Sequence, residues 1–230
     1  MKVGIFSDIH GNLGALNEMF KECYDRGVTT FLFAGDIFGY FYEQQEIISL
    51  LMKMDNLSCV IGNHDAKYLE CLKNEELMNE MIEKYGVSYR TQLTVEEIEW
   101  FKRLPRKLSF GIDNKRICMV HGSLQDELNG RIYPDSIIPL LDILDYDLVI
   151  MGHTHYQMLV KEHNTLILNP GSLGQPRDKK GFSYAIFDTD SNEVEIHKVS
   201  LDTRQLYEQI KRKEISITNK QYLIRKMEMS

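Results

Sequence analysis

The sequence predicts an α/β fold in which two mixed β-sheets pack together and helices lie outside them. Through residue 61, short apolar runs alternate with amphipathic helical segments, which is typical of parallel strands joined by helical crossovers. After Pro105, strands dominate the pattern, and a single parallel sheet fits this second half poorly. A chain of 230 residues can form one well-buried unit. We therefore expect a single domain over residues 1–230.

The N-terminal half contains the alternating strands and helices. The stretch that follows, residues 65–104, is helical and polar in pattern and contains no cluster of metal-ligand residues. Within it, Thr94 and Glu97 have the spacing of a capping box that opens a helix. The expected elements before that stretch are strands at 2–7, 30–34 and 57–61, with helices at 13–25 and 43–54.

The C-terminal half is richer in strands. One helix is expected at residues 136–144, and the polar tail from Ile210 onward is either a surface helix or frayed, with no assigned function. The expected strands are 107–112, 116–120, 148–151, 157–161, 165–168, 183–187 and 193–198.

The composition is that of an ordinary globular protein, with 43% hydrophobic and 27% charged residues. A net charge of -7 argues against tight binding to duplex nucleic acid, which depends on Lys and Arg to neutralise phosphates. It does not argue against a small phosphate substrate, because bound metals can dominate the local field.

The four cysteines form no C-x-x-C pair and no zinc-like spacing, so we expect reduced structural thiols. The apolar start of the chain is broken at Ser7 and Asp8, too early for a signal peptide, and no apolar run approaches the ~20 residues of a membrane helix. We therefore expect a cytoplasmic protein that does not enter a membrane. The cysteines are Cys23, Cys59, Cys71 and Cys118.

One local pattern recurs five times: an apolar strand followed at once by a short loop of metal-ligand residue types. Strand ends are rigid, and the loops beyond them in layered α/β folds are where ligands collect. Several strands ending together can therefore surround one point. The loops are Asp8-Ile9-His10, Gly35-Asp36, Gly62-Asn63-His64-Asp65, His121-Gly122 and Gly152-His153-Thr154-His155.

Each of these residues alone has an ordinary structural explanation. An aspartate such as Asp8 often caps a helix or begins a turn, Asn63 after glycine suits a left-handed turn, and a lone His121 is more often hydrogen-bonded than ligating. Five of the seven histidines nevertheless fall in these loops. His163 and His197 lie outside the pattern, and we expect them to be exposed or hydrogen-bonded. The repetition predicts one shared metal site.

As an ordered set, the motifs D-x-H, G-D, G-N-H-D, V-H-G and G-H-T-H resemble the calcineurin-like metallophosphoesterase family. The resemblance runs from Asp8 to His155 and includes the Asn169-Pro170-Gly171-Ser172 turn. The DIHGN, GDIFGY and NPGS-x-G-Q-P-R segments are most similar to small prokaryotic phosphodiesterases. The resemblance implies a four-layer sandwich, with residues 66–104 as a helical segment that shapes the pocket. Phe41 stands where many relatives have glycine, so the pocket wall near Tyr40 is expected to differ.

The resemblance further implies a centre of two divalent transition-metal ions. Mixed imidazole and carboxylate ligands suit manganese, iron, zinc or nickel better than magnesium, and we expect manganese. Paired ions need a shared anionic ligand to offset their repulsion. By resemblance, Asp8, His10 and His155 hold one ion, Asn63, His121 and His153 hold the other, and Asp36 bridges the two.

The same resemblance implies a mechanism, in which metal-activated hydroxide attacks phosphorus in line. His64 is the candidate general acid for the leaving group, and Asp65 the residue that orients it. The alternative for His64 is a histidine that merely donates a hydrogen bond to a nearby carbonyl.

Four further residues are candidate substrate contacts. Asn12 is an outer contact of the site or the cap of the first helix, and Ser172 is an outer-shell or substrate contact. Arg177 either binds a phosphate or belongs to a solvated basic loop with Lys179 and Lys180. Tyr40 completes this set.

The resulting functional hypothesis is two-metal hydrolysis of a small phosphoester, with phosphodiesters preferred because of the resemblance. A protein phosphatase and a dinucleotide-polyphosphate hydrolase are alternatives, separated from it by residues 66–104. A non-catalytic scaffold is the alternative from another class, and we would expect it to lack His64 or a metal ligand. The sequence retains all of them and carries no indication of the oligomeric state.

Overall fold

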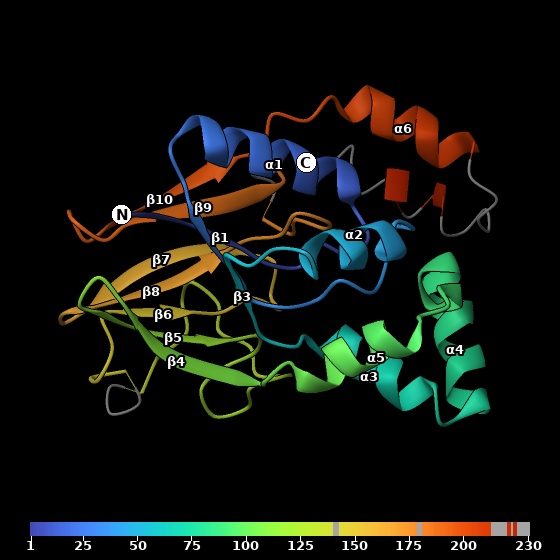
Figure 1. The fold of residues 1–230 in the computed structure, drawn as a ribbon, viewed down its shortest axis with the longest axis horizontal. Helices are drawn as coiled ribbons and strands as arrows, with labels where there is room; N and C mark the ends of the chain where they lie inside the picture. Colours follow the sequence, from blue (N-terminus) through green and yellow to red (C-terminus); the bar gives the residue numbers. More distant parts are fainter. Residues whose placement is uncertain (140–142, 179–180, 213–219, 222, 225–230) are drawn as a thin grey trace.

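The computed structural model describes residues 1–139, 143–178, 181–212, 220–221 and 223–224, and contains two five-stranded sheets (Figure 1). The first has the order β10-β9-β1-β2-β3 and the second β4-β5-β6-β8-β7. The first sheet comprises β1 (Lys2–Phe6), β2 (Thr30–Phe33), β3 (Leu57–Cys59), β9 (Ser183–Asp188) and β10 (Glu193–Lys198). The second comprises β4 (Lys107–Ile112), β5 (Lys115–Val120), β6 (Leu148–Ile150), β7 (Gln157–Glu162) and β8 (Thr165–Pro170).

Parallel strands with helical crossovers form the N-terminal half, as the alternating pattern predicted. β1 pairs in parallel with β2, and β2 with β3, while β9 runs antiparallel to β1. The crossovers are α1 (Leu13–Asp25) and α2 (Gln44–Leu51). Because β1, β2 and β3 are parallel, their carboxyl ends all reach the same edge of the sheet.

Two layers of buried side chains hold the sheets in place. Ile5 and Leu32 of the first sheet belong to the same buried cluster as Ile150 and Leu168 of the second, so this cluster lies between the sheets. On the opposite face of the first sheet, Phe6 contributes to a larger core beneath α1 and α2. Each fully buried aliphatic or aromatic side chain contributes about 1.5–3 kcal/mol, so the strands that carry the site are rigidly anchored.

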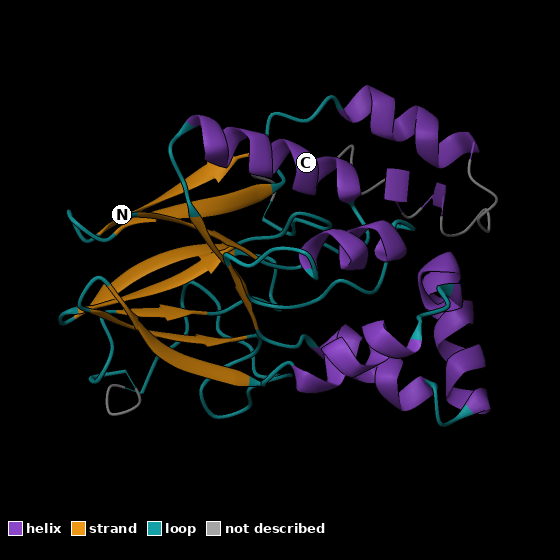
Figure 2. Ribbon diagram, in the orientation of Figure 1, coloured by secondary structure: helices purple, strands orange, loops and turns teal. Residues whose placement is uncertain are grey.

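The outer face of the second sheet is covered by side chains from the described parts of the connection between β5 and β6, which Figure 2 draws as loop. The predicted helix at 136–144 was wrong for the residues that can be described: residues 136–139 are not helical and 143–145 form a turn, while 140–142 lie outside the described residues. Pro139 explains the difference, because the residue before a proline is driven away from the helical conformation.

The stretch at residues 65–104 is helical, as expected, and lies at one end of the sandwich (Figure 1). Thr94 caps α5 (Val95–Arg103), and its hydroxyl accepts a hydrogen bond from the Glu97 amide while the Glu97 carboxylate accepts one from the Thr94 amide. The predicted capping box is therefore confirmed. The helices are α3 (Asn63–Cys71), α4 (Glu75–Tyr85), the short 3₁₀ helix η1 (Gly86–Arg90), α5 (Val95–Arg103) and, in the tail, α6 (Thr203–Arg212).

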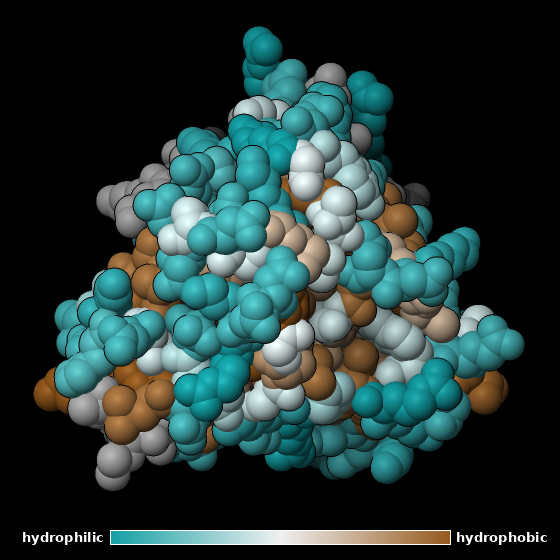
Figure 3. Space-filling model, turned by 60° about the vertical axis from the view of Figure 1, so that its left-hand side comes forward, coloured by the Kyte–Doolittle hydropathy of each residue, from teal (hydrophilic) through white to brown (hydrophobic). Residues whose placement is uncertain are grey.

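The face of the molecule in Figure 3 is mostly hydrophilic and carries only small, separated hydrophobic areas. Such scattered apolar side chains are normal for a globular surface. In the part of the chain that the structure describes, no helix is both long and apolar enough to cross a bilayer. All four cysteines are buried and free of disulfides.

Candidate metal centre

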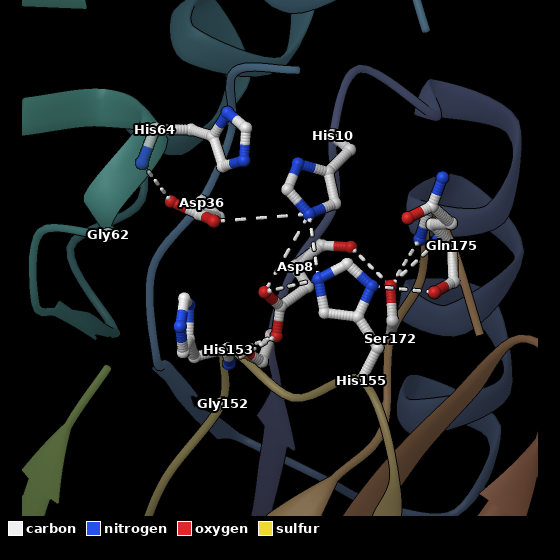
Figure 4. Close-up of polar contacts among 12 residues, drawn as sticks. Asp8, His10, Asp36, Gly62, His64, Gly152, His153, His155, Ser172 and Gln175 are labelled. Atoms are coloured by element: carbon white, nitrogen blue, oxygen red, sulfur yellow. Dashed lines mark hydrogen bonds and ion pairs between the residues drawn. The ribbon is translucent and has the colours of Figure 1, made fainter. Parts of the chain in front are cut away.

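The predicted ligand residues converge at the carboxyl ends of β1, β2, β3, β5 and β6. Figure 4 shows Asp8, His10, Asp36, His153 and His155 gathered at this point. All seven come together, although the outermost pair is 147 positions apart in sequence. Six of them are buried, and Asn63 is partly buried. The seven are Asp8, His10, Asp36, Asn63, His121, His153 and His155.

The loops hold many of these residues in an unusual backbone conformation. Non-glycine residues rarely adopt positive φ, which costs of order 1–3 kcal/mol unless the surroundings enforce it. The strain is concentrated where the chemistry is expected. Five of the seven have positive φ: Asp8 at 53°, His10 at 49°, Asp36 at 73°, His153 at 64° and His155 at 62°.

The first group of donor atoms surrounds Asp8 Oδ1. The Nε2 atom of His155 lies 3.2 Å from this oxygen and that of His10 lies 3.7 Å from it. The two Nε2 atoms are 3.1 Å apart. Ligands about 2.1 Å from a common ion lie about 3 to 3.5 Å from one another, so the spacing suits a metal.

The second group surrounds Asn63 Oδ1, which lies 2.9 Å from His121 Nε2 and 2.9 Å from His153 Nδ1. Asp36 Oδ2 lies 3.3 Å from His121 Nε2 and 3.9 Å from His10 Nε2. This single carboxylate oxygen therefore lies between the two groups.

Backbone carbonyls determine which nitrogen each histidine presents to the centre. Nδ1 of His10 lies 2.5 Å from the Phe38 oxygen, that of His121 lies 2.7 Å from the Ala34 oxygen, and that of His155 lies 2.6 Å from the Gln175 oxygen. A carbonyl only accepts, so Nδ1 must donate and Nε2 of a neutral ring keeps its lone pair. The three rings therefore direct lone pairs at the centre.

This arrangement fits divalent cations better than hydrogen bonds. Two lone pairs 3.1 Å apart, on His10 and His155, cannot bond to each other unless one ring gains a proton. Asp8 Oδ1 and Asp36 Oδ2 are buried without a hydrogen-bond partner. Orphaned buried acceptors are rare and call for an explanation, and a cation at each group supplies one.

The pKa shifts of the buried carboxylates and histidines also favour bound cations at this centre. Burial alone raises the pKa of Asp36, but the surrounding imidazoles, His121 foremost, outweigh it and hold that pKa far below its usual range. Burial lowers the pKa of His121, yet attraction to Asp36 prevails and raises it to about 9. Burial, then repulsion by His155, lowers the pKa of His10 to about 3. The buried carboxylates thus attract positive charge to the centre.

Known proteins share this architecture. Residues 1–192 match the family model of the calcineurin-like phosphoesterase superfamily domain. The chain belongs to this superfamily. The family is metal-dependent, and the expectation of a phosphoesterase fold and enzyme class is confirmed at the level of the family.

The uncharacterised protein MJ0912 of Methanocaldococcus jannaschii is 31% identical over 90% of this chain and 91% of its own length. The phosphodiesterase MJ0936 of the same organism is 24% identical over 74% of this chain and 83% of its own. The crystal structure of a metallophosphoesterase from Sphaerobacter thermophilus is 28% identical, with a TM-score of 0.80 over 97% of this chain and 98% of that one.

In this phosphoesterase chain, the segment that follows β3 carries the candidate general acid, His64, and contacts the ligand cluster. The His64 amide donates to Asp36 Oδ1 at 2.8 Å and so helps to orient the carboxylate. The ring of His64 lies beside the ligand cluster in Figure 4. Its Nδ1 lies 3.2 Å from the Tyr89 hydroxyl.

Asp65 does not orient the His64 ring, contrary to the prediction. Its two carboxylate oxygens accept hydrogen bonds from the amides of Asp36, Ile37, Phe38 and Gly62 at 2.8–3.1 Å. Burial and repulsion by Asp36 raise the pKa of Asp65 to about 6, and these amides oppose that rise. The carboxylate therefore holds the loop that carries Asp36. The physical reason is that Asp65 occupies the first turn of α3, where an acid turns back toward free amides.

Two of the four candidate substrate contacts lie behind the ligand loops. Asn12 caps α1 through the Ala15 amide at 3.1 Å, which is the capping alternative. The Ser172 hydroxyl donates to the Asp8 carbonyl at 2.8 Å. Both side chains are completely buried, so they support the loops and do not reach a substrate.

The other two lie at the edge of the centre. Tyr40 has a φ of 49°, and its ring centroid is 4.7 Å from that of His10. A guanidinium nitrogen of the exposed Arg177 lies 3.4 Å from the Tyr40 hydroxyl. Lys179 and Lys180 lie outside the described residues.

Sequence reasoning missed two tyrosines of the helical segment. The ring centroid of Tyr85 is 4.9 Å from that of His64, and Tyr89 makes the hydrogen bond to it. Both lie more than 20 positions from His64, and no local motif marks them. Only the packing of the end of α4 and of η1 against the site reveals them.

Proposed function

We propose that this chain is a two-metal phosphodiesterase acting on a small phosphoester substrate. The observation that carries the proposal is Asp36 Oδ2, a buried orphan oxygen between two separate groups of donor atoms. One oxygen in that position is what a pair of neighbouring cations requires. The preference for diesters is supported by the similarity to the phosphodiesterase MJ0936.

In this proposal Asp8, His10 and His155 hold one ion, and Asn63, His121 and His153 hold the other, with Asp36 shared. Manganese is our first choice, since the mixed nitrogen and oxygen donors suit a transition metal. When bound, the ions supply Lewis acidity and a low pKa for water.

The protein's own part is positioning and proton transfer. Asp8 Oδ2 accepts from the Ser7 hydroxyl at 2.6 Å and from the His153 amide at 3.1 Å, which turns Oδ1 toward the centre. His64 is the proposed general acid, and it donates a proton to the leaving oxygen through Nε2. Tyr40 and Arg177 are proposed to contact the substrate at the mouth of the site.

Two further points belong to the proposal. Residues 1–230 form one domain in which residues 66–104 shape the pocket, because η1 contacts both His64 and the loop after β2. The proposed location is the cytoplasm.

The test is hydrolysis by the purified full chain, stripped with a chelator and reloaded with Mn, Ni, Zn or Mg. Bis(para-nitrophenyl) phosphate and para-nitrophenyl phosphate compare diester with monoester. We expect faster diester hydrolysis with Mn than with Mg, and strong loss in Asp36→Asn. In His64→Ala we expect strong loss on a phenyl diester, whose leaving group needs a proton. Undiminished hydrolysis in Asp36→Asn would refute the two-metal mechanism. Metal binding without any hydrolysis would favour a scaffold.

A further inference from the structure

The 3₁₀ helix η1 (Gly86–Arg90) is anchored to the catalytic loops by two adjacent side chains. The Ser88 hydroxyl accepts hydrogen bonds from the Gly39 amide at 2.7 Å and from Gln44 Nε2 at 2.8 Å. Ser88 is completely buried and Tyr89 is 1% exposed. A segment of the helical region is thus fastened at the point where His64 lies.

Tyr89 makes two contacts with the same residue. Its hydroxyl donates to the backbone carbonyl of His64 at 3.2 Å, and its oxygen lies 3.2 Å from His64 Nδ1. A hydroxyl has one proton, and the carbonyl uses it. The second contact is therefore a hydrogen bond from Nδ1–H to the tyrosine oxygen. This leaves Nε2 as the nitrogen that can exchange a proton with a substrate.

The tyrosine ring has little freedom to move. Its centroid lies 5.6 Å from that of Tyr85, 5.9 Å from that of Phe38 and 6.0 Å from that of Tyr68. Burial, reinforced by the negative charge of Asp36, raises the pKa of the Tyr89 hydroxyl, so it remains protonated. The hydroxyl is a fixed acceptor for Nδ1–H.

We propose that Tyr89 is a positioning residue that orients His64 and selects its Nδ1–H tautomer, so that Nε2 faces the leaving group. The inference rests on the proposed function for its chemical consequence. With Asp65 engaged by backbone amides, Tyr89 takes the orienting part that an acid next to His64 was expected to play.

The proton balance is simple. A water oxygen forms the new bond to phosphorus and releases a proton to solvent. The bond from phosphorus to the leaving oxygen breaks, and its electron pair stays on that oxygen. The His64 imidazolium gives it the Nε2 proton. The remaining neutral ring is the Nδ1–H tautomer that Tyr89 stabilises.

Leaving groups of different basicity make this measurable. A para-nitrophenolate is weakly basic and leaves without being protonated, whereas an unsubstituted phenolate or an alkoxide is more basic and needs a proton from the general acid. General acid catalysis typically contributes about 100-fold to 10,000-fold, so loss of orientation in Tyr89→Phe should cost about tenfold or more in kcat/KM for a phenyl or alkyl diester. For bis(para-nitrophenyl) phosphate we expect a change of less than about twofold.

Tyr68→Phe is the matched control. Tyr68 belongs to the same aromatic cluster and is 1% exposed, but its hydroxyl donates to the Thr91 carbonyl. The Tyr68→Phe substitution also removes a tyrosine hydroxyl from this aromatic cluster, but it leaves the contacts of the His64 ring unchanged. Equal losses on both classes of diester in Tyr89→Phe, or the same pattern in Tyr68→Phe, would overturn the proposal. In a His64→Asn background, Tyr89→Phe should have no further effect on the poor leaving groups.

A second measurement needs no catalysis. Nitrogen NMR of histidine-labelled protein at mildly alkaline pH reports the tautomer of each ring, and His64→Asn assigns the His64 signals. We expect the Nδ1–H tautomer in the unmodified chain and in Tyr68→Phe, and a shift toward Nε2–H in Tyr89→Phe. An unchanged tautomer would overturn the positioning role. This readout is independent of hydrolysis, so failure of the proposed function would show separately, as metal-loaded protein that cleaves no phosphoester.

Discussion

Metal ions should stabilise this protein strongly, and Asp36→Asn should abolish that effect. In the structure, Asp8 Oδ1 and Asp36 Oδ2 are buried acceptors without partners. Each such atom costs about 1–3 kcal/mol, so ions that engage both should raise the free energy of unfolding by about 2–6 kcal/mol. For a chain of 230 residues this corresponds to an increase in Tm of roughly 5–20 °C.

The assay is thermal unfolding of chelator-stripped protein with and without saturating Mn, together with the bound metal measured per chain. We expect about two ions in the unmodified protein, about one in His155→Ala, and less than one in Asp36→Asn, whose Tm should not respond to Mn. Asp145→Asn is the control for the acid-to-amide change, because that side chain is 88% exposed. If Asp36→Asn kept two ions, or the full rise in Tm, the assignment of Asp36 as the shared ligand would be wrong.

Three further substitutions have predictable effects. Gly62→Ala places a Cβ 2.0 Å from Asp36 Oδ1, so it should lower the free energy of unfolding by about 1–3 kcal/mol and reduce the amount of metal bound per chain. Gly111→Ala is its control, because the new Cβ would have no neighbour closer than 3.8 Å, and metal analysis should show full occupancy. Thr94→Ala removes the cap of α5 and should lower the stability in urea unfolding by about 1 kcal/mol with kcat unchanged. Ser88→Ala removes a buried acceptor and should cost about 1–3 kcal/mol in the same measurement, with activity reduced if η1 shifts. Unchanged stability in any of the three would contradict the contact concerned.

The convergence of the candidate ligands was predictable from the sequence because strand ends are local features. An apolar run that stops at Asp8 or at His121 identifies both the strand and the residue just beyond it. Parallel order then brings those residues to one edge without any knowledge of side-chain contacts. The helix expected at 136–144 is absent at the described residues 136–139 and 143–144 for a local reason as well, since Pro139 drives the residue before it away from the helical conformation.

The directions of the side chains were not predictable in the same way. Asp65 follows His64 in sequence, but both residues lie in α3, which begins at Asn63. Consecutive side chains of a helix point about 100° apart, so Asp65 is directed away from the His64 ring. A signal was available, since an acid three residues after Gly62 occupies the position of a capping-box acid. For Tyr89 there was none, because its contact with His64 spans 25 positions and depends on how η1 packs.

Residues 62–65 and the helical segment divide the control of the active site between them. Three of the four amides that bind Asp65 belong to the loop after β2, and the His64 amide binds Asp36 itself, so one short segment holds the proposed shared metal ligand in place. The His64 ring, in contrast, takes its hydrogen bond from Tyr89, in a region that lies outside the strand framework. With His64 as the proposed proton donor, we expect a change in the helical segment to alter proton donation while leaving the candidate metal ligands unmoved. It follows that metal affinity and leaving-group preference should vary independently in this protein, the first with the strand-end loops and the second with η1.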